Sequence, residues 1–208
     1  MAHIDKTVPG SFCWMELATT NQNAAKAFYT SLFGWAASDA GRMAIIQDPT
    51  GAVFQAWQPL KHGEIGISNV HGAFCWADLN TGDVAAASAF YSGLLGWKLE
   101  AGEKDPSGYL HIRNGDSFIG GIPPAEHRDP NAPPHWMLYF EVADCDASAA
   151  KATELGARPI VPSISMEGVG RMSAIADPQG AVFALFATLN RGTRTALDVR
   201  PERQRSSR

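Results

Sequence analysis

The sequence predicts an α+β fold built from three tandem β-α-β-β-β modules, and two internal repeats support this prediction. Segment 12–35 recurs as segment 74–97, with Phe-Cys-Trp at the start and Ala-Phe-Tyr-x-x-Leu-x-Gly-Trp at the end of both copies. Segment 41–54 recurs as segment 170–183 and ends in Asp-Pro-x-Gly-Ala-Val-Phe in both copies. Self-similarity over such lengths indicates duplicated structural units.

The spacing of the repeats predicts the domain organisation. The first repeat has an offset of 62 residues and the second an offset of 129, so the N-terminal copy lacks 67 residues that the C-terminal copy contains. We therefore expect a complete two-module domain at residues 71–188. Residues 11–60 are expected to form a single shortened module, in which the front of one module is joined to the back of another. Residues 190–208 are rich in arginine, lack apolar periodicity and are predicted to be a disordered tail.

Each copy of the first repeat predicts a strand followed by a helix. Apolar side chains recur with a period of two at the start of the repeat and then at helical spacing. Thr20 or Asn21 is expected to cap the first helix, and Gly34 suits the left-handed conformation that ends a helix. Gly96 is placed to end the second helix in the same way.

A third strand–helix unit is predicted at residues 135–156, without a full copy of the repeat. Its helix can be capped by Asp144 or Asp146. The prolines of residues 123–134 predict a polar, stiff linker before it. This unit supplies the third module of the fold.

Hairpins are predicted in three places. Each copy of the second repeat contains an Asp-Pro-x-Gly turn, at residues 48–51 and 177–180, where Pro in the second position and Gly in the fourth suit a type I turn. Between the second and third strand–helix units, two further strands are joined by Asn114-Gly115, a dipeptide typical of tight hairpins. These hairpins supply the later strands of the modules.

Composition and charge narrow the classes of function. The formal net charge is −4, but residues 190–208 carry a net +4 and the remaining residues carry −8. An acidic body argues against nucleic-acid binding, and the absence of a long apolar run argues against a membrane span. An odd number of cysteines (Cys13, Cys75 and Cys145) without a secretory signal favours the cytoplasm and buried, structural thiols.

The helix ends in Ala-Phe-Tyr-x-x-Leu-x-Gly-Trp and the hairpins in Asp-Pro-x-Gly-Ala-Val-Phe resemble those of the vicinal oxygen chelate superfamily. This superfamily contains glyoxalase I, extradiol dioxygenases, fosfomycin-resistance enzymes and bleomycin-binding proteins. More narrowly, the chain resembles the two-domain actinobacterial glyoxalase-like proteins, with a shortened N-terminal unit. The resemblance covers most of residues 11–188 and implies that two modules pair into a curved sheet that closes around a cup.

Metal-dependent members of this superfamily place a His or Gln on the first strand of each module and a Glu on the last. The resemblance puts Trp14, Trp76 and Met137 at the first-strand positions, and Gln55 and Ala184 at the last-strand positions. Small divalent metals need nitrogen or oxygen ligands, and within this set Gln55 alone could supply one. The sequence therefore predicts that the inherited metal site is absent and that no cofactor is required.

The alternation of side chains along the strands predicts an aromatic cup with a few polar groups. Asp78, Glu141 and His135 are the candidate residues for proton transfer, and the two carboxylates are expected to face each other across the cup. The candidate ligand-binding residues are Phe74, Trp76, His111, Met137, Tyr139 and Phe186. The structural alternative is that the carboxylates anchor neighbouring strands, which their recurrence at equivalent repeat positions favours. Arg42 and Arg171 also recur; they could bind an anionic substrate, but repetition again favours pairing within the scaffold.

Two functions fit these features best. One is a binding protein for a small, apolar or aromatic molecule, and the other is a metal-independent lyase, isomerase or cyclase of secondary metabolism. An interaction module without a ligand is a third reading. Because the two modules of residues 71–188 can pair with each other, the segment 11–60 is left with an unpaired sheet edge, and we predict a homodimer through this segment.

Overall fold

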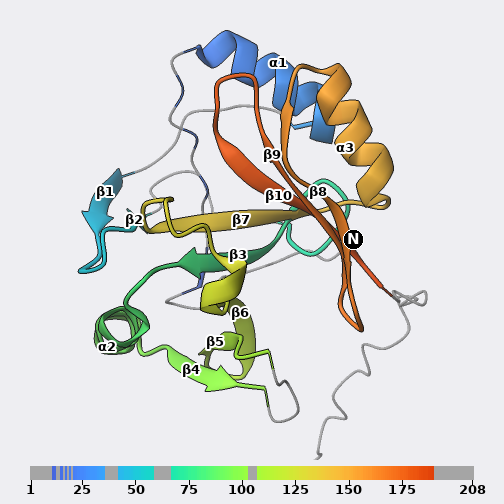
Figure 1. Cartoon of the computed structure of the whole chain (residues 1–208). Helices are drawn as coiled ribbons and strands as arrows, with labels where there is room; N and C mark the ends of the chain where they lie inside the picture. Colours follow the sequence, from blue (N-terminus) through green and yellow to red (C-terminus); the bar gives the residue numbers. More distant parts are fainter. Residues whose placement is uncertain are drawn as a thin grey trace, which may run out of the picture.

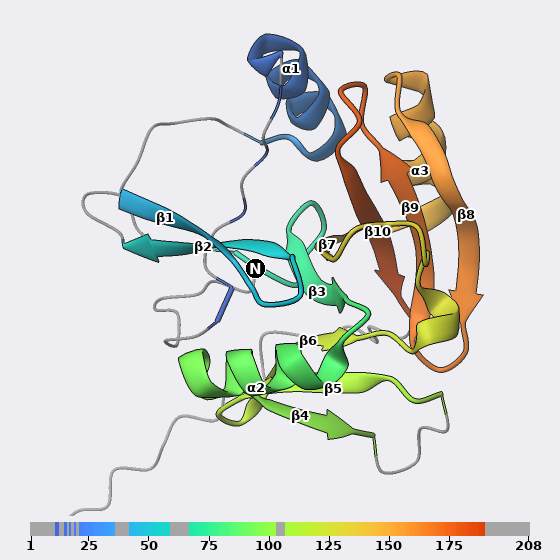
Figure 2. The same cartoon turned by 60° about the vertical axis from the view of Figure 1, so that its left-hand side comes forward.

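The computed structural model describes the chain at residues 11, 12, 15, 17, 19, 21–35, 42–58, 67–102 and 107–189. These residues form an eight-stranded sheet and a separate two-stranded sheet, together with three α-helices and one short 3-10 helix (Figures 1 and 2). Within this described part of the chain, no helix is long and apolar enough to cross a membrane.

The eight-stranded sheet consists of two β-α-β-β-β modules, as the sequence predicts. The first contains β3 (Phe74–Asn80), α2 (Val84–Leu95), β4 (Lys98–Ala101), β5 (Leu110–Asn114) and β6 (Ser117–Ile122). The second contains β7 (His135–Glu141), α3 (Cys145–Glu154), β8 (Arg158–Met166), β9 (Gly170–Ala176) and β10 (Val182–Thr188). In each module the first strand runs parallel to the last, and the modules meet at the antiparallel pair β3–β7. The strand order of this curved sheet is therefore β4-β5-β6-β3-β7-β10-β9-β8 (Figure 2).

The N-terminal segment contacts both halves of this sheet. Its helix α1 (Gln22–Phe33) lies beside α3, whereas its hairpin of β1 (Arg42–Gln47) and β2 (Val53–Gln58) forms the two-stranded sheet and contacts β7 (Figure 1). The strand expected at the start of this segment falls mostly outside the described residues. The two described parts of the segment therefore pack on the paired modules at different places.

The helix ends follow from the local sequence. Asn21 caps α1 by accepting a hydrogen bond from the backbone N–H of Ala24, at 3.1 Å, so the choice left open between Thr20 and Asn21 is decided. Asp144 caps α3 in the same way, at 3.0 Å from the N–H of Ala147. Gly34 ends α1 with a φ of 76°, a left-handed conformation that a residue without a side chain adopts at low cost.

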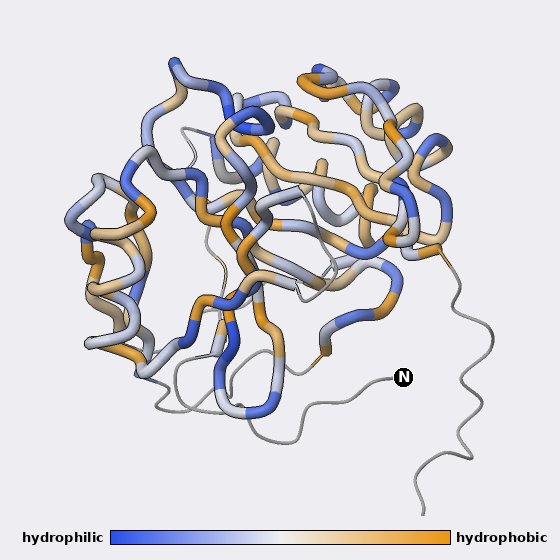
Figure 3. Tube along the Cα trace, turned by 60° about the horizontal axis from the view of Figure 1, so that its bottom comes forward, coloured by the Kyte–Doolittle hydropathy of each residue, from blue (hydrophilic) through white to orange (hydrophobic). Residues whose placement is uncertain are grey.

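The hydrophobic core lies on the face of the sheet that the helices cover. One cluster joins α1 and α3 to the second module through Phe28, Phe140 and Leu185. A second cluster joins α2 to the first module and includes Leu79 and Ile112. Figure 3 shows how hydrophobic and hydrophilic stretches follow one another along the chain. The opposite face of the sheet is the one that the sequence predicts to line the cup.

Two strands of the modules have no clear signal in the sequence. β4 has four residues, too few to establish an alternation of side chains. β8 contains Pro159 and Pro162, which usually argue against a strand, but β8 lies at the edge of the sheet, where a missing backbone N–H is tolerated. The linker before β7 includes the 3-10 helix η1 (Ala125–His127).

Candidate functional site

The most polar feature of the cup face is the buried carboxyl group of Asp78. Side chains alternate along β3, so that Ala77 and Leu79 pack into the core on the helix-covered face while Trp76 and Asp78 point to the opposite face. Asp78 is only 5% exposed although it carries a carboxyl group. A buried carboxyl needs hydrogen-bond partners, because burial without them costs several kcal/mol, on the order of 2–7 for a polar group.

Three side chains supply these partners. The hydroxyl of Tyr109 donates to Oδ1 of Asp78 at 2.5 Å, and the hydroxyl of Tyr139 donates to Oδ2 at 2.8 Å. The indole N–H of Trp76 lies 3.1 Å from the same Oδ1 and 2.7 Å from the hydroxyl of Tyr109. Since Tyr139 belongs to β7 and the other residues to the first module, this cluster links the two modules at the centre of the cup face.

Burial raises the pKa of Asp78 above its ordinary value, and this effect outweighs the opposing influences. The hydrogen bonds from Tyr109, Tyr139 and Trp76 lower the pKa, as does the charge of His111. Burial also raises the pKa of both tyrosines, and the carboxylate beside them adds to the rise. The two hydroxyls therefore stay protonated, and Asp78 is a carboxyl group that retains its proton to a higher pH than usual.

Two glycines in β6 allow close approach: Gly121 makes room for the cluster, and Gly120 lies against the backbone of β3. A β-carbon on Gly121 would lie 2.0 Å from the hydroxyl oxygen of Tyr109, and one on Gly120 would lie 2.3 Å from the carbonyl oxygen of Ala77. Asp78 pairs with Gly121 across β3 and β6, so the missing side chain is what allows Tyr109 to reach the carboxyl. A Gly-Gly pair inside a strand was the available signal for this close approach.

Several residues proposed as ligand contacts surround Asp78. The ring of His111 lies 5.0 Å from that of Tyr109 and 6.3 Å from that of Trp76. Met137 is the cross-strand partner of Asp78. Phe186 extends the aromatic surface, with its ring 6.4 Å from that of Tyr139.

The expected position of Phe74 on the cup face is wrong. A β-bulge between Phe74 and Trp76 shifts the register of β3 against β7, so these two residues do not share a face. Phe74 is 7% exposed and packs in the core with Phe28 and Phe140. The extra residue of the bulge moves its side chain to the helix-covered side.

The expected pair of facing carboxylates is also not formed. Asp78 lies opposite Met137, whereas Glu141 lies four residues further along β7. Glu141 accepts a hydrogen bond from the hydroxyl of Thr188 at 3.0 Å and thereby joins the end of β7 to the end of β10. The alternative that the carboxylates anchor neighbouring strands therefore fits Glu141, because its carboxylate connects the ends of two strands.

His135 occupies the other end of β7. It pairs with Asn80 across the strands, and its Nδ1 lies 2.8 Å from the carbonyl oxygen of Pro133. The structure thus places the three candidate proton-transfer residues at separate points along the β3–β7 pair. Asp78 is the one that lies within the aromatic cluster.

The side chains in the cup do not fit a metal ion of the kind found in the superfamily. Among the residues that the structure describes, no group of three His, Cys, Asp or Glu side chains is arranged to hold one. Trp76 and Met137, at the ligand positions of β3 and β7, offer an N–H donor and a thioether, and Ala184 offers no ligand atom. Trp14 lies outside the described residues.

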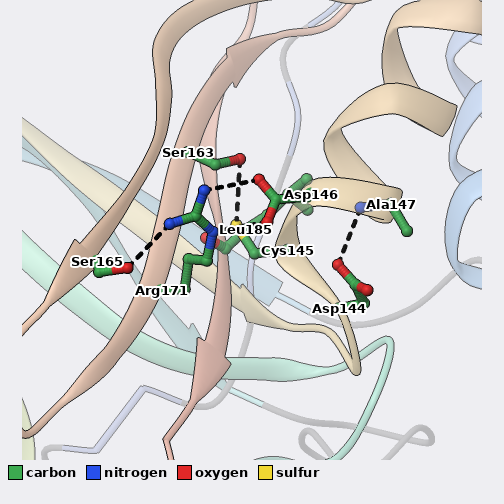
Figure 4. Close-up of polar contacts among 8 residues, drawn as sticks. All are labelled: Asp144, Cys145, Asp146, Ala147, Ser163, Ser165, Arg171 and Leu185. Atoms are coloured by element: carbon green, nitrogen blue, oxygen red, sulfur yellow. Dashed lines mark hydrogen bonds and ion pairs between the residues drawn. The ribbon is translucent and has the colours of Figure 1, made fainter.

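Arg171 forms contacts within the protein that join β9 to α3 and β8. Its guanidinium contacts both carboxylate oxygens of Asp146, at 2.7 and 2.9 Å, and the hydroxyl of Ser165 at 2.9 Å (Figure 4). This ion pair lowers the pKa of Asp146. The side chain of Arg42, its counterpart in the first repeat, is not among those that the structure describes.

The cysteine thiols show no sign of a reactive site where they are described. Cys145 is buried beside Ser163 and Leu185 (Figure 4), and burial raises the pKa of its thiol, which disfavours the reactive thiolate. The thiol of Cys75 donates to the carbonyl oxygen of Tyr139 at 3.4 Å. Cys13 lies outside the described residues.

A cavity of about 450 Å³ lies on the other face of the sheet. Hairpin β1–β2 forms one wall and α2 forms another, and Trp136 and Leu138 of β7 form the floor. These two residues alternate with Met137 and Tyr139, so the cavity and the cup lie on opposite faces. The sequence pattern gave no direct signal for this cavity, because its walls come from both repeats.

The chain was compared with models of protein families. Residues 76–186 match the family model described as glyoxalase-like domain. This range contains Asp78 and all three of its hydrogen-bond partners. It also spans most of the paired β-α-β-β-β modules.

Two relatives show how the chain compares over a greater length. The proposed glyoxylase CFP32 of Mycobacterium tuberculosis (strain CDC 1551 / Oshkosh) is 30% identical over 248 residues, covering 83% of this chain and 93% of that protein. The alignment exceeds the 208 residues of this chain, so the relative contains residues without a counterpart here. The anthracycline biosynthesis protein DauV of Streptomyces sp. (strain C5) is 34% identical over 154 residues, covering 70% of this chain and 52% of that protein.

One solved structure that matches part of this chain is that of methylmalonyl-CoA epimerase from Mycobacterium tuberculosis. It is 19% identical, with a TM-score of 0.42, and the match covers 56% of this chain and 88% of that chain.

Proposed function

This chain belongs to the glyoxalase-like domain family, and we propose that it binds a small, largely apolar or aromatic molecule in the cup of residues 71–188 without a metal ion. The observation that carries this proposal is the Asp78 carboxyl, buried on the cup face and held by tyrosines of both modules. Binding sites of this kind combine apolar walls with a few fixed polar groups. The resemblance to the superfamily implied a cup, and Asp78 gives the cup a specific polar anchor.

The hydrogen bonds within the cluster define the chemistry of the ligand. The hydroxyl protons of Tyr109 and Tyr139 are both directed to Asp78, and the oxygen of Tyr109 already accepts from the indole N–H of Trp76, so the oxygen of Tyr139 is the one that would present lone pairs to a ligand. When Asp78 is protonated, its own proton adds a donor, as in other sites where burial keeps a carboxyl group neutral. A planar ring system that carries hydroxyl and carbonyl groups matches both features.

The name of one relative agrees with this ligand class. DauV is described as an anthracycline biosynthesis protein, and anthracyclines are polycyclic aromatic compounds with hydroxyl and carbonyl groups. We therefore choose a hydroxyanthraquinone as the first ligand to test. The aromatic rings of Trp76, Tyr139 and Phe186 would stack on or surround such a molecule.

A second function is proton transfer in a metal-independent lyase, isomerase or cyclase. The raised pKa of Asp78 favours it, because a general acid or base works best when its pKa lies near the operating pH. Tyr109 and Tyr139 would then hold the carboxyl in place and stabilise its ionised form after it gives up its proton. Glu141 and His135 take no part in this cluster.

Titration with 1,8-dihydroxyanthraquinone tests the proposed binding. We expect saturable binding to the wild type, followed through ligand absorbance, and at least about tenfold weaker binding to Tyr139→Ala. The exposed Asp116→Asn serves as control and should bind like the wild type, and a chelator should have no effect. Non-saturable binding, or equal affinity for wild type and Tyr139→Ala, contradicts a site in the cup.

The variant Asp78→Asn separates the two functions. A binding protein keeps most of its affinity, because the amide oxygen still accepts a hydrogen bond from a tyrosine. An enzyme that uses Asp78 for proton transfer keeps its affinity but loses turnover, measured as exchange of a ligand C–H for deuterium from the solvent. Exchange that persists in Asp78→Asn removes this residue from the mechanism.

A further inference from the structure

We infer that the cavity between hairpin β1–β2 and helix α2 is a second ligand site, which takes an uncharged, apolar ring compound. The cavity lies on the helix-covered face of the sheet and is separate from Asp78, so this inference does not rest on the proposed function. Its volume of about 450 Å³ is in the range of small-molecule pockets in proteins.

The wall chemistry selects an uncharged ligand. Among the described residues that line the cavity none carries a charged side chain, and most are aromatic or aliphatic. The hydroxyl of Tyr91 is already engaged, since it donates to Asp48 at 2.9 Å and accepts from the indole N–H of Trp136 at 3.1 Å. An ion would find no counter-charge in this wall, whereas an apolar molecule would replace water against carbon atoms.

The wall is also well suited to a flat ring. Tyr91 stacks on Trp97 with the ring centres 5.1 Å apart and an angle of 18° between the planes, and Trp136 meets Tyr91 edge-on. Phe12 adds a further ring, 5.2 Å from that of Trp136. Rigid aromatic walls keep their shape without a ligand, so little conformational entropy is lost on binding.

The hydrogen bond from Tyr91 to Asp48 holds the two walls of the cavity together. Asp48 lies in the turn of the hairpin, and its other carboxylate oxygen accepts from the backbone N–H groups of Thr50 and Ala52. This turn is therefore rigid and is attached to α2 from the side. Phe54 of β2 also contacts the rings of Phe90 and Tyr91 of α2, and residues of both elements line the cavity.

Entry to the site is possible at its rim. Val53 and Leu94 line the cavity from opposite walls and are each 52% exposed. With an interior packing density of about 0.75, a ligand of roughly 340 Å³ would fill the cavity of about 450 Å³. That size corresponds to a compound of a few fused rings.

The uncharged dye N-phenyl-1-naphthylamine provides the test with the full chain. Because three tryptophans line the cavity, we expect saturable binding with energy transfer from tryptophan to the dye. Leu94→Trp and Ala56→Trp narrow the cavity from its two walls, and each should weaken binding at least about tenfold. The matched control Ile164→Trp, an exposed position on β8, should bind like the wild type.

The outcome distinguishes this site from the cup. Loss of binding in Leu94→Trp or Ala56→Trp but not in Tyr139→Ala supports the second site, with folding of each variant checked by circular dichroism. Loss in Tyr139→Ala alone assigns the dye to the cup and overturns the inference. Non-saturable binding, or equal affinity in both cavity variants and the wild type, overturns it as well.

Discussion

The two copies of the Asp-Pro-x-Gly hairpin share a sequence and a turn, but they differ in their surroundings. In β9–β10 the hairpin is flanked by β8 and β7, and Ala174 is 2% exposed. In β1–β2 the described residues provide no flanking strand, and Ile45, the residue equivalent to Ala174, is 66% exposed. The comparison shows that the local sequence specifies the hairpin, whereas the neighbouring strands decide whether its faces are buried.

Each hairpin is also hydrogen-bonded to the helix that belongs to the other part of the chain. Tyr29 of α1 donates to Asp177 in the turn of the second hairpin at 3.1 Å, and Tyr91 of α2 donates to Asp48 in the turn of the first at 2.9 Å. The shortened segment therefore contributes its helix to one module and its hairpin to the other. A segment that supplies core residues to both modules is part of the folded domain.

A tyrosine–aspartate contact occurs a third time, at Asp78 in the cup. Asp48 and Asp177 each use one oxygen to organise their own turn, which marks them as structural residues. Asp78 lies in a strand and receives side-chain hydrogen bonds from Trp76 and two tyrosines. A tyrosine–aspartate hydrogen bond thus joins a helix to a hairpin turn at two places, and at the third place it forms part of the candidate site.

The largest difference between the two hairpins is expected on removal of their equivalent phenylalanines. Phe183 is buried, with 4% of its surface exposed, so Phe183→Ala should reduce the free energy of unfolding by about 3–5 kcal/mol. Phe54 is half-buried, and Phe54→Ala should cost only about 1–2 kcal/mol, because less surface returns to water. Urea unfolding measures both. Equal losses would mean that the first hairpin is as tightly packed as the second.

Removing the two tyrosine–aspartate hydrogen bonds between the repeats should lower the free energy of unfolding by amounts that differ less. Tyr91→Phe removes the hydrogen-bond partner of both Asp48 and Trp136 and should cost about 2 kcal/mol. Tyr29→Phe removes one partner and should cost about 1 kcal/mol. Hydrogen exchange should also show loosening of hairpin β1–β2 in Tyr91→Phe. A larger effect in Tyr29→Phe would contradict this ranking.

The contact in the cup should respond to pH. The folded-state pKa of Asp78 lies above its unfolded value of about 4, so its contribution to stability is fully present below that pH and is lost as the pH rises through the folded pKa. Asp78→Asn should remove this loss and flatten the dependence of the unfolding free energy on pH. Urea unfolding from pH 4 to 8 tests it, with His111→Gln as a control for the neighbouring imidazole. An unchanged slope in Asp78→Asn would show that Asp78 ionises normally.

The smallest effect on stability is expected at the exposed face of the first hairpin, which we propose as a homodimer interface. Ile45→Lys should leave the unfolding free energy of the monomer within about 0.5 kcal/mol of the wild type, since the side chain is exposed. It should nevertheless convert a dimer into a monomer, measured by light scattering. The control Ile160→Lys, exposed on β8, should remain dimeric. A monomeric wild type at micromolar concentration would exclude this interface.

Much of the fold could be predicted from the sequence, because its signals are local. The cap at Asn21, the helix end at Gly34 and the turns at Asp48 and Asp177 depend on hydrogen bonds within about four residues. The site was harder to predict. Trp76 and Tyr139 were expected in the cup, but the contact between Asp78 and Tyr109 spans 31 positions and depends on the absence of a side chain at Gly121.

The sequence by itself determined the duplicated hairpins, the helices with their caps and the alternation that turns Asp78 away from the core. The tertiary structure decided where the duplicated pieces pack and which side chains meet. It placed Phe74 in the core through a bulge, joined Glu141 to Thr188, and left a cavity beside α2. The physical reason is that caps and turns are satisfied by near neighbours in the chain, whereas burial and the pKa of Asp78 depend on residues that only the folded sheet brings together.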